Sequence, residues 1–246
     1  MKTTKTVFDI IETLREKGGA RVTEVADELG LANSTVHRHL VTLTDRKYVT
    51  KEGDVYHVGL KFLELGEFTR SRQRAYSLAE TKVAELAEET GERAQFIVEE
   101  HGDAVYIHTE AGENAVKTDS AVGKRIPIHA TSAGKVILAH MLRPRLAAIL
   151  DGLELTPETE NTITDMDEFR TELEAIRERG YAFNDQEHTE GLRAIAVPID
   201  DPNGGVIGAL GISGPTHRMT GEWYRTEIPN LLLGSANELE LNVEYS

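Results

Sequence analysis

The sequence contains no cysteine, which excludes disulfide bonds, thiolate zinc sites and redox sensing through thiols. It also lacks any apolar run that approaches the ~18 residues of a membrane-spanning helix. The first residues, MKTTKTVFDI, have no hydrophobic core of the kind that secretory signals carry. Together these absences predict a cytoplasmic protein that has no contact with a membrane.

The common catalytic motifs are missing as well. GISGP at 211–215 fails the last position of the nucleophile motif G-x-S-x-G, and no phosphate-binding G-x-x-x-x-G-K-[ST] precedes either Gly-Lys pair. We therefore expect no catalytic residue, no cofactor and no enzyme. A metal-dependent or otherwise catalytic domain is the alternative; its metal would need distant histidines such as His101, His129 and His188, and turnover of a bound ligand would reveal it.

Positive charge is scarce and unevenly placed. The chain has 27 Lys and Arg against 42 Asp and Glu, a formal net charge of −15. Residues 1–60 hold nine of each kind, so the entire excess of acid lies in residues 61–246. This boundary indicates two domains, and the acidity argues against a purely architectural DNA binder. Only 10 of the 27 basic residues are lysine, and this composition suits a high-salt cytoplasm.

Residues 1–60 show three helical patterns followed by a hairpin pattern. The first helix ends at Gly18-Gly19 and the second, RVTEVADELG, at Gly30. Asn33 or Ser34 caps the third helix, NSTVHRHLVTL. KYVTKEGDVYHVG then predicts two strands around residues 52–54. Helix, turn, helix and hairpin in this order are typical of a winged helix-turn-helix.

The third helix has one apolar face and one polar face. Val36, Leu40 and Leu43 form the stripe that we expect to be buried, with His39 packed near it. An amphipathic helix alone is as typical of a packed core as of a DNA contact, so the interpretation depends on all four elements together. Arginine can bond guanine with two hydrogen bonds, and short hydroxyls can reach bases or phosphates. The predicted DNA-binding residues are Ser34, Thr35, His37, Arg38, Thr42, Arg46 and Lys51.

Residues 61–246 alternate hairpin and helix patterns. A long connecting helix is expected from about residue 60 to 90, and its RSRQR stretch at 70–74 fits either a phosphate contact or a solvated face. Hairpins are expected around residues 101–103 and 201–204, with a helix at 165–179 that Thr164 caps and Gly180 ends. A sheet built from hairpins and flanked by helices is an α+β arrangement with room for one cavity.

Several separated stretches resemble the IclR family of transcriptional regulators: EVADELGLANSTVHRHLVTL, IPIHATSAGKVILA, FNDQEHTEGLRAIAVPIDD and GALGISGP. The resemblance implies a winged helix-turn-helix at 1–60, a linker at 61–77 and a GAF-like α/β effector-binding domain at 78–246. It also implies a sequence-specific repressor or activator that binds a partly palindromic double-stranded DNA operator as a homodimer or dimer of dimers. A small organic-acid or sugar-acid effector would control that binding.

The start of the helix in HATSAGKVILA is the predicted effector site. Free N–H groups of Ser132, Ala133 and Gly134 at a helix start favour an anion, although a plain helix start capped by Ser132 fits the residues equally well. Ala194 stands where a cysteine is frequent in the family, so ligand identity does not transfer from relatives. By resemblance, the opposite wall comes from Asn184, Asp185, Leu192, Ala194, Gly211 and Ser213.

Overall fold

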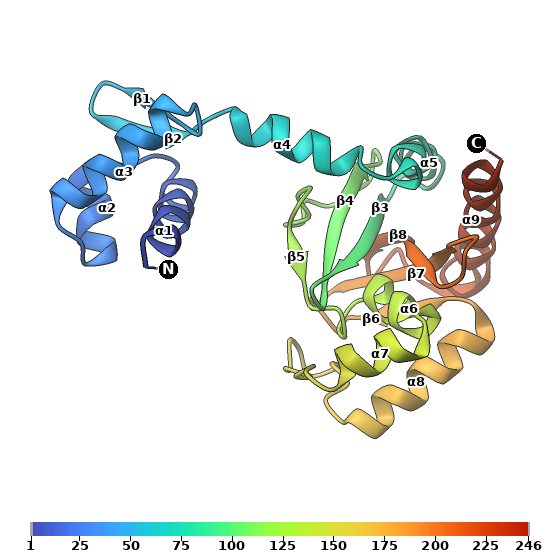
Figure 1. Ribbon diagram of the computed structural model, residues 1–246. Helices are drawn as coiled ribbons and strands as arrows, with labels where there is room; N and C mark the ends of the chain where they lie inside the picture. The colour runs from blue at the N-terminus through green and yellow to red at the C-terminus, as the bar shows by residue number, and fades with distance from the viewer. Residues whose placement is uncertain (1, 246) are drawn as a thin grey trace. The chain divides into compact units, whose positions relative to one another are not determined.

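The computed structural model describes residues 2–245, shown in Figure 1. Its internal contacts divide the chain into two compact units, Met1–Thr69 and Arg70–Ser246. The division falls inside the stretch 61–77 that was predicted as a linker. The predicted fold class, a winged helix-turn-helix followed by an α/β domain, is confirmed. No helix among residues 2–245 has both the length and the apolar character needed to cross a membrane.

The first unit packs three helices against a two-stranded hairpin. Its core includes Ile10, Leu14, Val25, Val36 and Leu40, each at most 1% exposed. The two strands pair antiparallel from Val49↔Val58 to Glu52↔Val55, so the predicted wing is confirmed. The elements are α1 (Lys2–Glu16), α2 (Val22–Leu29), α3 (Asn33–Asp45), β1 (Val49–Glu52) and β2 (Val55–Val58).

Two predicted helix caps are wrong. Helix α3 starts after Ala32, which has extended backbone and offers no side-chain oxygen, so neither Asn33 nor Ser34 is the cap. Both already lie in the first helical turn, where their side chains cannot fold back onto the N–H groups that a cap residue satisfies. Helix α8 (Met166–Arg179) is capped by Asp165, not Thr164: the Asp165 carboxylate accepts the backbone N–H of the second and third helical residues.

The segment from 60 to 90 is two helices rather than one. Helix α4 (Lys61–Arg70) and helix α5 (Arg74–Thr90) are separated at residues 71–73, where Gln73 has extended backbone. Helix α5 packs on the sheet through buried residues that include Tyr76, Val83 and Leu86. Within the basic stretch, Arg70 lies 3.7 Å from Glu80, which favours the solvated-face interpretation at that position.

The second unit is built on one six-stranded antiparallel sheet with the order β5-β4-β3-β8-β7-β6 (Figure 1). The predicted turns at 101–103 and 201–204 join β3 to β4 and β7 to β8, as expected. The bounds are β3 (Arg93–Glu100), β4 (Asp103–Ala111), β5 (Arg125–Ile126), β6 (Ala182–Asp185), β7 (Leu192–Asp200) and β8 (Val206–Pro215).

Helices cover both faces of this sheet, and alternate strand residues point into the two layers. Helices α5 and α9 (Ile228–Glu244) pack on one face with Phe96, Val197 and Leu210. Helices α6 (Ser132–His140) and α8 pack on the other face with Ile97 and Ala196. Helix α7 (Arg143–Leu150) joins this second layer, and the short π-helix η1 (Trp223–Glu227) leads into α9. The face that carries α6 also carries the cavity described below.

Candidate functional site

The predicted DNA-binding side chains lie on the surface of the first unit. Val36, Leu40 and Leu43 are buried, as the pattern predicted, while His39 is only half-buried beside them. Of the seven predicted residues, Thr35 is half-buried and these six are exposed: Ser34, His37, Arg38, Thr42, Arg46 and Lys51. The polar face of α3 is therefore available to a ligand, and its assignment to DNA remains a prediction.

The start of α3 adds two backbone donors to this face. The N–H groups of Thr35 and Val36 both bond the carbonyl of Ala32. Those of Asn33 and Ser34 have no bonding partner among the described residues, since α3 lacks a side-chain cap. Free N–H groups and the helix dipole favour a phosphate at such a terminus. On the wing, the Lys51 ammonium lies 5.3 Å from the centre of the Tyr56 ring, which orients it beside the hairpin.

A cavity of about 350 Å³ lies in the second unit, and three neighbouring strands form its floor. In the sheet register, Gln95 of β3 pairs with Gly211 of β8, and Ala194 of β7 pairs with Ser213 of β8. The Gln95 amide donates to the Ser213 hydroxyl at 2.8 Å. Ala194 and Gly211 have small side chains or none, which leaves space above the sheet, and Leu192 adds apolar surface. The floor thus combines apolar surface with one amide and one hydroxyl.

The start of α6 forms one wall. Thr131 is the cap: its hydroxyl accepts the N–H of Gly134 at 3.1 Å, so Gly134 does not offer a free donor. The N–H groups of Ser132 and Ala133 have no bonding partner among residues 2–245, and both residues line the cavity. A Cβ on Gly134 would lie 1.9 Å from the carbonyl oxygen of Ile128. Gly134 is therefore needed for close backbone packing, while Ser132 and Ala133 face the cavity.

The end of β6 and the turn after it form the facing wall. The Asn184 amide donates to the carbonyl of Ala130 at 2.7 Å, which fixes the end of this strand against the residues before α6. Asp185 points the other way, because strand neighbours alternate faces, and it forms an ion pair with Arg193 at 2.7 Å. Asp185 is thus outside the cavity, whereas Asn184 and His188 line it.

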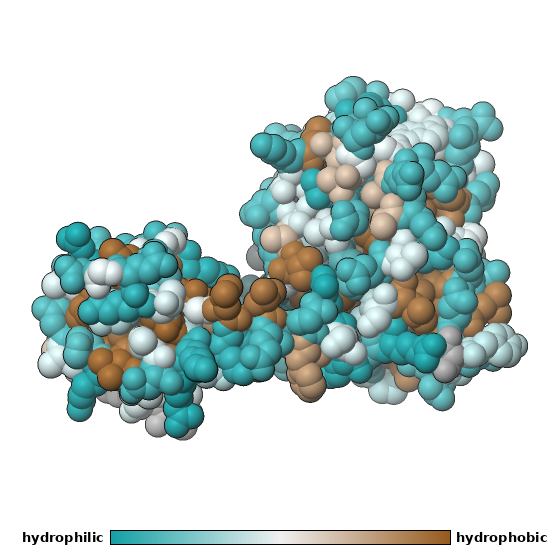
Figure 2. All heavy atoms as spheres, turned by 90° about the horizontal axis from the view of Figure 1, so that it is seen from above, coloured by the Kyte–Doolittle hydropathy of each residue, from teal (hydrophilic) through white to brown (hydrophobic). Residues whose placement is uncertain are grey.

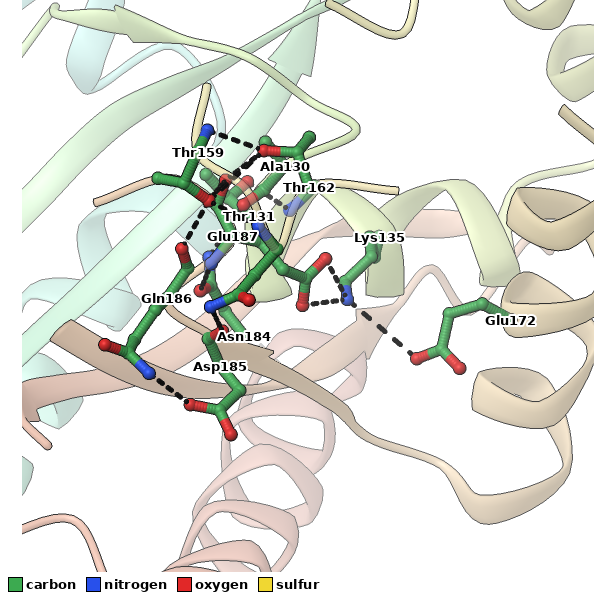
Figure 3. A network of polar contacts seen from close by, with 12 residues as sticks. Ala130, Thr131, Lys135, Thr159, Thr162, Glu172, Asn184, Asp185, Gln186 and Glu187 are labelled. Atoms are coloured by element: carbon green, nitrogen blue, oxygen red, sulfur yellow. Dashed lines mark hydrogen bonds and ion pairs between the residues drawn. The ribbon is translucent and has the colours of Figure 1, made fainter. Parts of the chain in front are cut away.

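A buried polar network holds this turn in place (Figure 3). The Lys135 ammonium, whose side chain is 2% exposed, contacts both carboxylate oxygens of Glu187 at 2.6 and 2.7 Å and lies 3.9 Å from Glu172 of α8. The Asn184 side-chain oxygen accepts the N–H of Glu187 at 2.9 Å, and the Thr162 hydroxyl donates to the carbonyl of Glu187 at 2.6 Å. Helices α6 and α8 and the turn at 184–189 are therefore tied together directly behind the cavity.

The loop between β4 and β5 completes the cavity and is rich in polar groups. It contributes Lys117, Thr118, Asp119, Ser120 and Lys124. The Lys124 ammonium lies 2.5 Å from the Asp119 carboxylate, so these two charges compensate each other. Lys117 is exposed and has no ion-pair partner among the described residues. Arg193 of β7 also lines the cavity but is paired with Asp185. Among the described lining residues, Lys117 is therefore the one lysine or arginine without an ion-pair partner.

Burial shifts the protonation of two groups in the cavity. It raises the pKa of Tyr106 to about 12, so this phenol stays neutral and can donate a hydrogen bond. Burial also lowers the pKa of His188 below its ordinary value. Glu187, behind the wall, has its pKa raised by burial, while the Lys135 ammonium opposes that effect. Burial therefore favours the neutral forms of Tyr106 and His188 on the cavity lining.

Seven of the nine predicted effector residues line this cavity: Ser132, Ala133, Asn184, Leu192, Ala194, Gly211 and Ser213. Gly134 and Asp185 do not, for the reasons given above. Sequence reasoning missed Gln95, Tyr106, His188 and the loop residues 117–120. The sequence could have indicated Gln95, because it is the one polar residue inside the apolar run of β3. It faces the same layer as Ile97. The loop has no periodic pattern from which its position could be inferred.

The histidines considered for a metal site do not assemble one. His101 is exposed in the β3–β4 turn, and the His129 ring bonds the carbonyl of Thr156 at 2.9 Å. Across the part of the chain that the structure describes, no group of three His, Asp or Glu side chains could hold a metal ion.

Comparison with known proteins matches both units to one family. The profile described as "Bacterial transcriptional regulator IclR C-terminal" matches residues 69–240, and that of the "IclR helix-turn-helix domain" matches residues 6–53. The chain is similar to the HTH-type transcriptional regulator KdgR of Escherichia coli K12, with 35% identity over 241 residues that cover 97% of this chain and 91% of the relative.

Two solved structures extend the similarity to three dimensions. The Thermotoga maritima IclR structure is 30% identical, has a TM-score of 0.86 and covers 99% of each chain. A double mutant of the PobR inducer-binding domain from Acinetobacter, solved as a complex with 3-hydroxybenzoic acid, is 30% identical with a TM-score of 0.62. It covers 67% of this chain and 96% of that one. The curated relatives in these comparisons are named as transcriptional regulators.

Proposed function

The chain belongs to the IclR family of DNA-binding transcriptional regulators, and from this premise we propose that a small organic or sugar acid, bound in the cavity of the second unit, controls its binding to a DNA operator. The observation that carries the proposal is the wall at the start of α6, where the N–H groups of Ser132 and Ala133 face a cavity of about 350 Å³. Free donors at a helix start favour a carboxylate.

The rest of the cavity fits the body of such a ligand. Hydroxyl and amide groups of Gln95, Ser213 and Asn184 can bond ligand hydroxyls, while Ile97 and Leu192 provide apolar surface. The volume lies within the range of ordinary small-molecule sites, about 300 to 1,000 Å³. The Acinetobacter relative is an inducer-binding domain in complex with 3-hydroxybenzoic acid, which supports an acidic ligand for this domain.

DNA recognition is assigned to α3 and the wing. Arg38 and Thr42 on the exposed face of α3 would reach base edges, while Arg46 and Lys51 would contact phosphates. One winged helix-turn-helix unit covers only a few base pairs. We therefore propose that the protein binds a partly palindromic operator as a homodimer or dimer of dimers in the cytoplasm. Regulation in either direction, repression or activation, fits this arrangement.

The proposed seam of the dimer is α4. This helix buries none of its own residues in the described chain, and Leu63 is 68% exposed, after Leu60 at 83%. Figure 2 shows apolar side chains gathered on the helical segment that joins the two units. Together with Leu65 of α4, which is 40% exposed, Leu60 and Leu63 form the kind of apolar surface that a second copy covers in a symmetric dimer.

The effector proposal is tested on the full-length protein with an operator selected from genomic DNA. Pyruvate, D-gluconate and 3-hydroxybenzoate serve as an α-keto acid, a sugar acid and an aromatic acid. We expect at least one acid to change the operator Kd measured by fluorescence anisotropy. Ala133→Leu places a bulky side chain on the wall, since Ala133 lines the cavity, and should abolish this response while leaving operator binding intact.

Two further variants make the result interpretable. Ala194→Leu narrows the same cavity from the opposite side, and Ala194 is only partly buried, so this change is the milder one for folding. Ala148→Leu, on the exposed surface of α7, is the matched control and should respond to acid as the wild type does. Undiminished acid affinity by calorimetry in folded Ala133→Leu and Ala194→Leu proteins would place the effector elsewhere.

A further inference from the structure

Within residues 2–245, His188 is the one residue of the cavity lining with a buried side-chain polar atom that lacks a hydrogen-bond partner. Its Nδ1 atom is buried and makes no hydrogen bond, and the residue lines the cavity beside Asn184 and Thr189. Buried polar atoms without a partner are rare because each loses its bonds to water without replacement. An unpaired ring nitrogen on a cavity wall therefore indicates a group that is completed when the cavity is filled.

The position of His188 is fixed by its neighbours rather than by its own bonds. The preceding residue, Glu187, is held through its side chain by Lys135 and through its backbone by Asn184 and Thr162 (Figure 3). These contacts anchor the turn next to the residues that precede α6. His188 therefore lines the same cavity as Ser132 and Ala133, whose N–H groups at the start of α6 are free.

We propose that His188 makes this site selective for the ionised form of the effector: the imidazole takes up a proton when the ligand carboxylate binds and then donates a charged hydrogen bond to it. This inference rests on the proposed function and adds a residue and a protonation step to it. A carboxylate and an imidazolium stabilise each other inside a cavity where water screens them poorly. A neutral amide of the same shape gains no such interaction.

The charges around His188 agree with this role. Burial lowers the pKa of the empty-cavity imidazole, and Lys124 and His129 act in the same direction. Glu158 opposes them, but it is exposed and therefore screened by water, and the net shift is downward. Lys124 is itself compensated by Asp119, and the His129 ring is engaged by Thr156. Burial therefore favours the neutral imidazole in the ligand-free protein, and the negative charge of a bound ligand would favour the protonated form.

The sign of the pH dependence follows from linkage. Binding that takes up one proton becomes weaker as pH rises between the pKa of His188 in the empty protein and its pKa in the complex. In this window the Kd of the acid should increase by up to about tenfold per pH unit, the limit for one proton. The carboxyl group of each probe has a pKa of about 4 or lower, so it stays ionised above pH 6 and does not contribute.

The test is calorimetry on full-length protein between pH 6 and 8, with pyruvate, D-gluconate and 3-hydroxybenzoate as probes. Titrations in phosphate and in Tris, which differ in ionisation enthalpy, give the number of protons taken up. We expect uptake approaching one proton per chain in the wild type. In His188→Gln we expect no uptake, a Kd that does not change with pH, and a preference for 3-hydroxybenzoate over 3-hydroxybenzamide that falls about tenfold or more, equivalent to one pKa unit.

Controls separate failure of this inference from failure of the proposed function. His217→Gln, an exposed histidine outside the cavity lining, should behave as the wild type. Acid binding without proton uptake, or proton uptake that persists in His188→Gln, would overturn the role of His188 and leave the acidic effector in place. Failure of all three acids to bind the wild type would count against the acidic effector itself. Nuclear magnetic resonance of the His188 ring should show its pKa rise on saturation with acid, and an unchanged pKa would also refute the inference.

Discussion

Removal of the Lys135 ammonium should destabilise the second unit in a way that depends on pH. Lys135 is 2% exposed and contacts both oxygens of Glu187, whose side chain is 10% exposed. In Lys135→Met the Glu187 carboxylate has lost its cation but is still buried. Its least costly response is to bind a proton, since an unpaired buried charge is far less favourable than a neutral acid.

The loss of stability in Lys135→Met is set by the free energy needed to protonate Glu187. At pH 7, protonation of a carboxyl with the ordinary pKa of 4.5 spans 2.5 pH units, equivalent to about 3.4 kcal/mol. At pH 5 the same step costs only about 0.7 kcal/mol. Without Lys135 the folded-state pKa of Glu187 rises further above its ordinary value, so the loss of stability grows as pH rises above 4.5 and disappears as pH falls toward it. We therefore expect Lys135→Met to lose roughly 3 kcal/mol at pH 7 and less than ~1 kcal/mol at pH 5.

Urea unfolding followed by the fluorescence of Trp223 is the assay. Trp223 is the only tryptophan in the chain and packs against the core of the second unit, so it reports that unit alone. Lys135→Met/Glu187→Gln leaves a neutral pair and should recover most of the loss at pH 7. Lys82→Met removes an ammonium whose partners, Glu85 and Glu238, are exposed and can be hydrated, and should cost at most about 1 kcal/mol at either pH. Equal losses for Lys135→Met at pH 5 and pH 7 would refute the reasoning.

Three further outcomes are expected. Arg38→Ala should weaken operator binding by ~1–3 kcal/mol with little effect on random DNA, and an equal loss on both would make Arg38 a phosphate contact. Lys51→Ala should act through charge and lower the slope of log K against log salt by about 1, measured by anisotropy, whereas an unchanged slope would remove Lys51 from the phosphate contacts. Leu63→Glu should convert the proposed dimer to a monomer in light scattering at micromolar concentration, while Val122→Glu, on another exposed apolar residue, should not. A dimer that survives Leu63→Glu would place the seam elsewhere.

The elements of this fold could be predicted where the side-chain pattern decides the structure. Burial of Val36, Leu40 and Leu43 follows from helical spacing, and the turns at 101–103 and 201–204 follow from residues that accept tight backbone. Helix ends were less predictable because neighbouring oxygens compete for the same N–H groups. Thr131 rather than Ser132 caps α6, and only the backbone of residue 131, still extended, distinguishes the two.

The site could be predicted in part for a related reason. Residues close in sequence, such as Ser132 and Ala133, were found because a helix start is a local feature. Gln95 and Tyr106 were missed because only sheet register brings β3 and β4 to this cavity. The buried Lys135 was missed as well: its partners Glu187 and Glu172 lie far along the chain, and in sequence a lysine four residues into a helix looks solvated.

The acidity of the chain is consistent with DNA binding because the charge is distributed by unit. The first unit, which carries the proposed DNA-binding residues, is nearly neutral, and Arg38, Arg46 and Lys51 lie exposed on α3, just after it and on the wing. The excess of acid belongs to residues 61–246, where it repels the phosphate backbone and opposes non-specific binding. The affinity of a DNA-binding unit with few cations depends more on base contacts, and on the spacing of two such units in a dimer, than on phosphate neutralisation. In the effector site proposed for the second unit, the free N–H groups of α6, Lys117 and His188 would attract an acid at close range, although the net charge of the unit is negative. At both proposed sites we therefore expect specificity to come from a few positioned groups rather than from net charge.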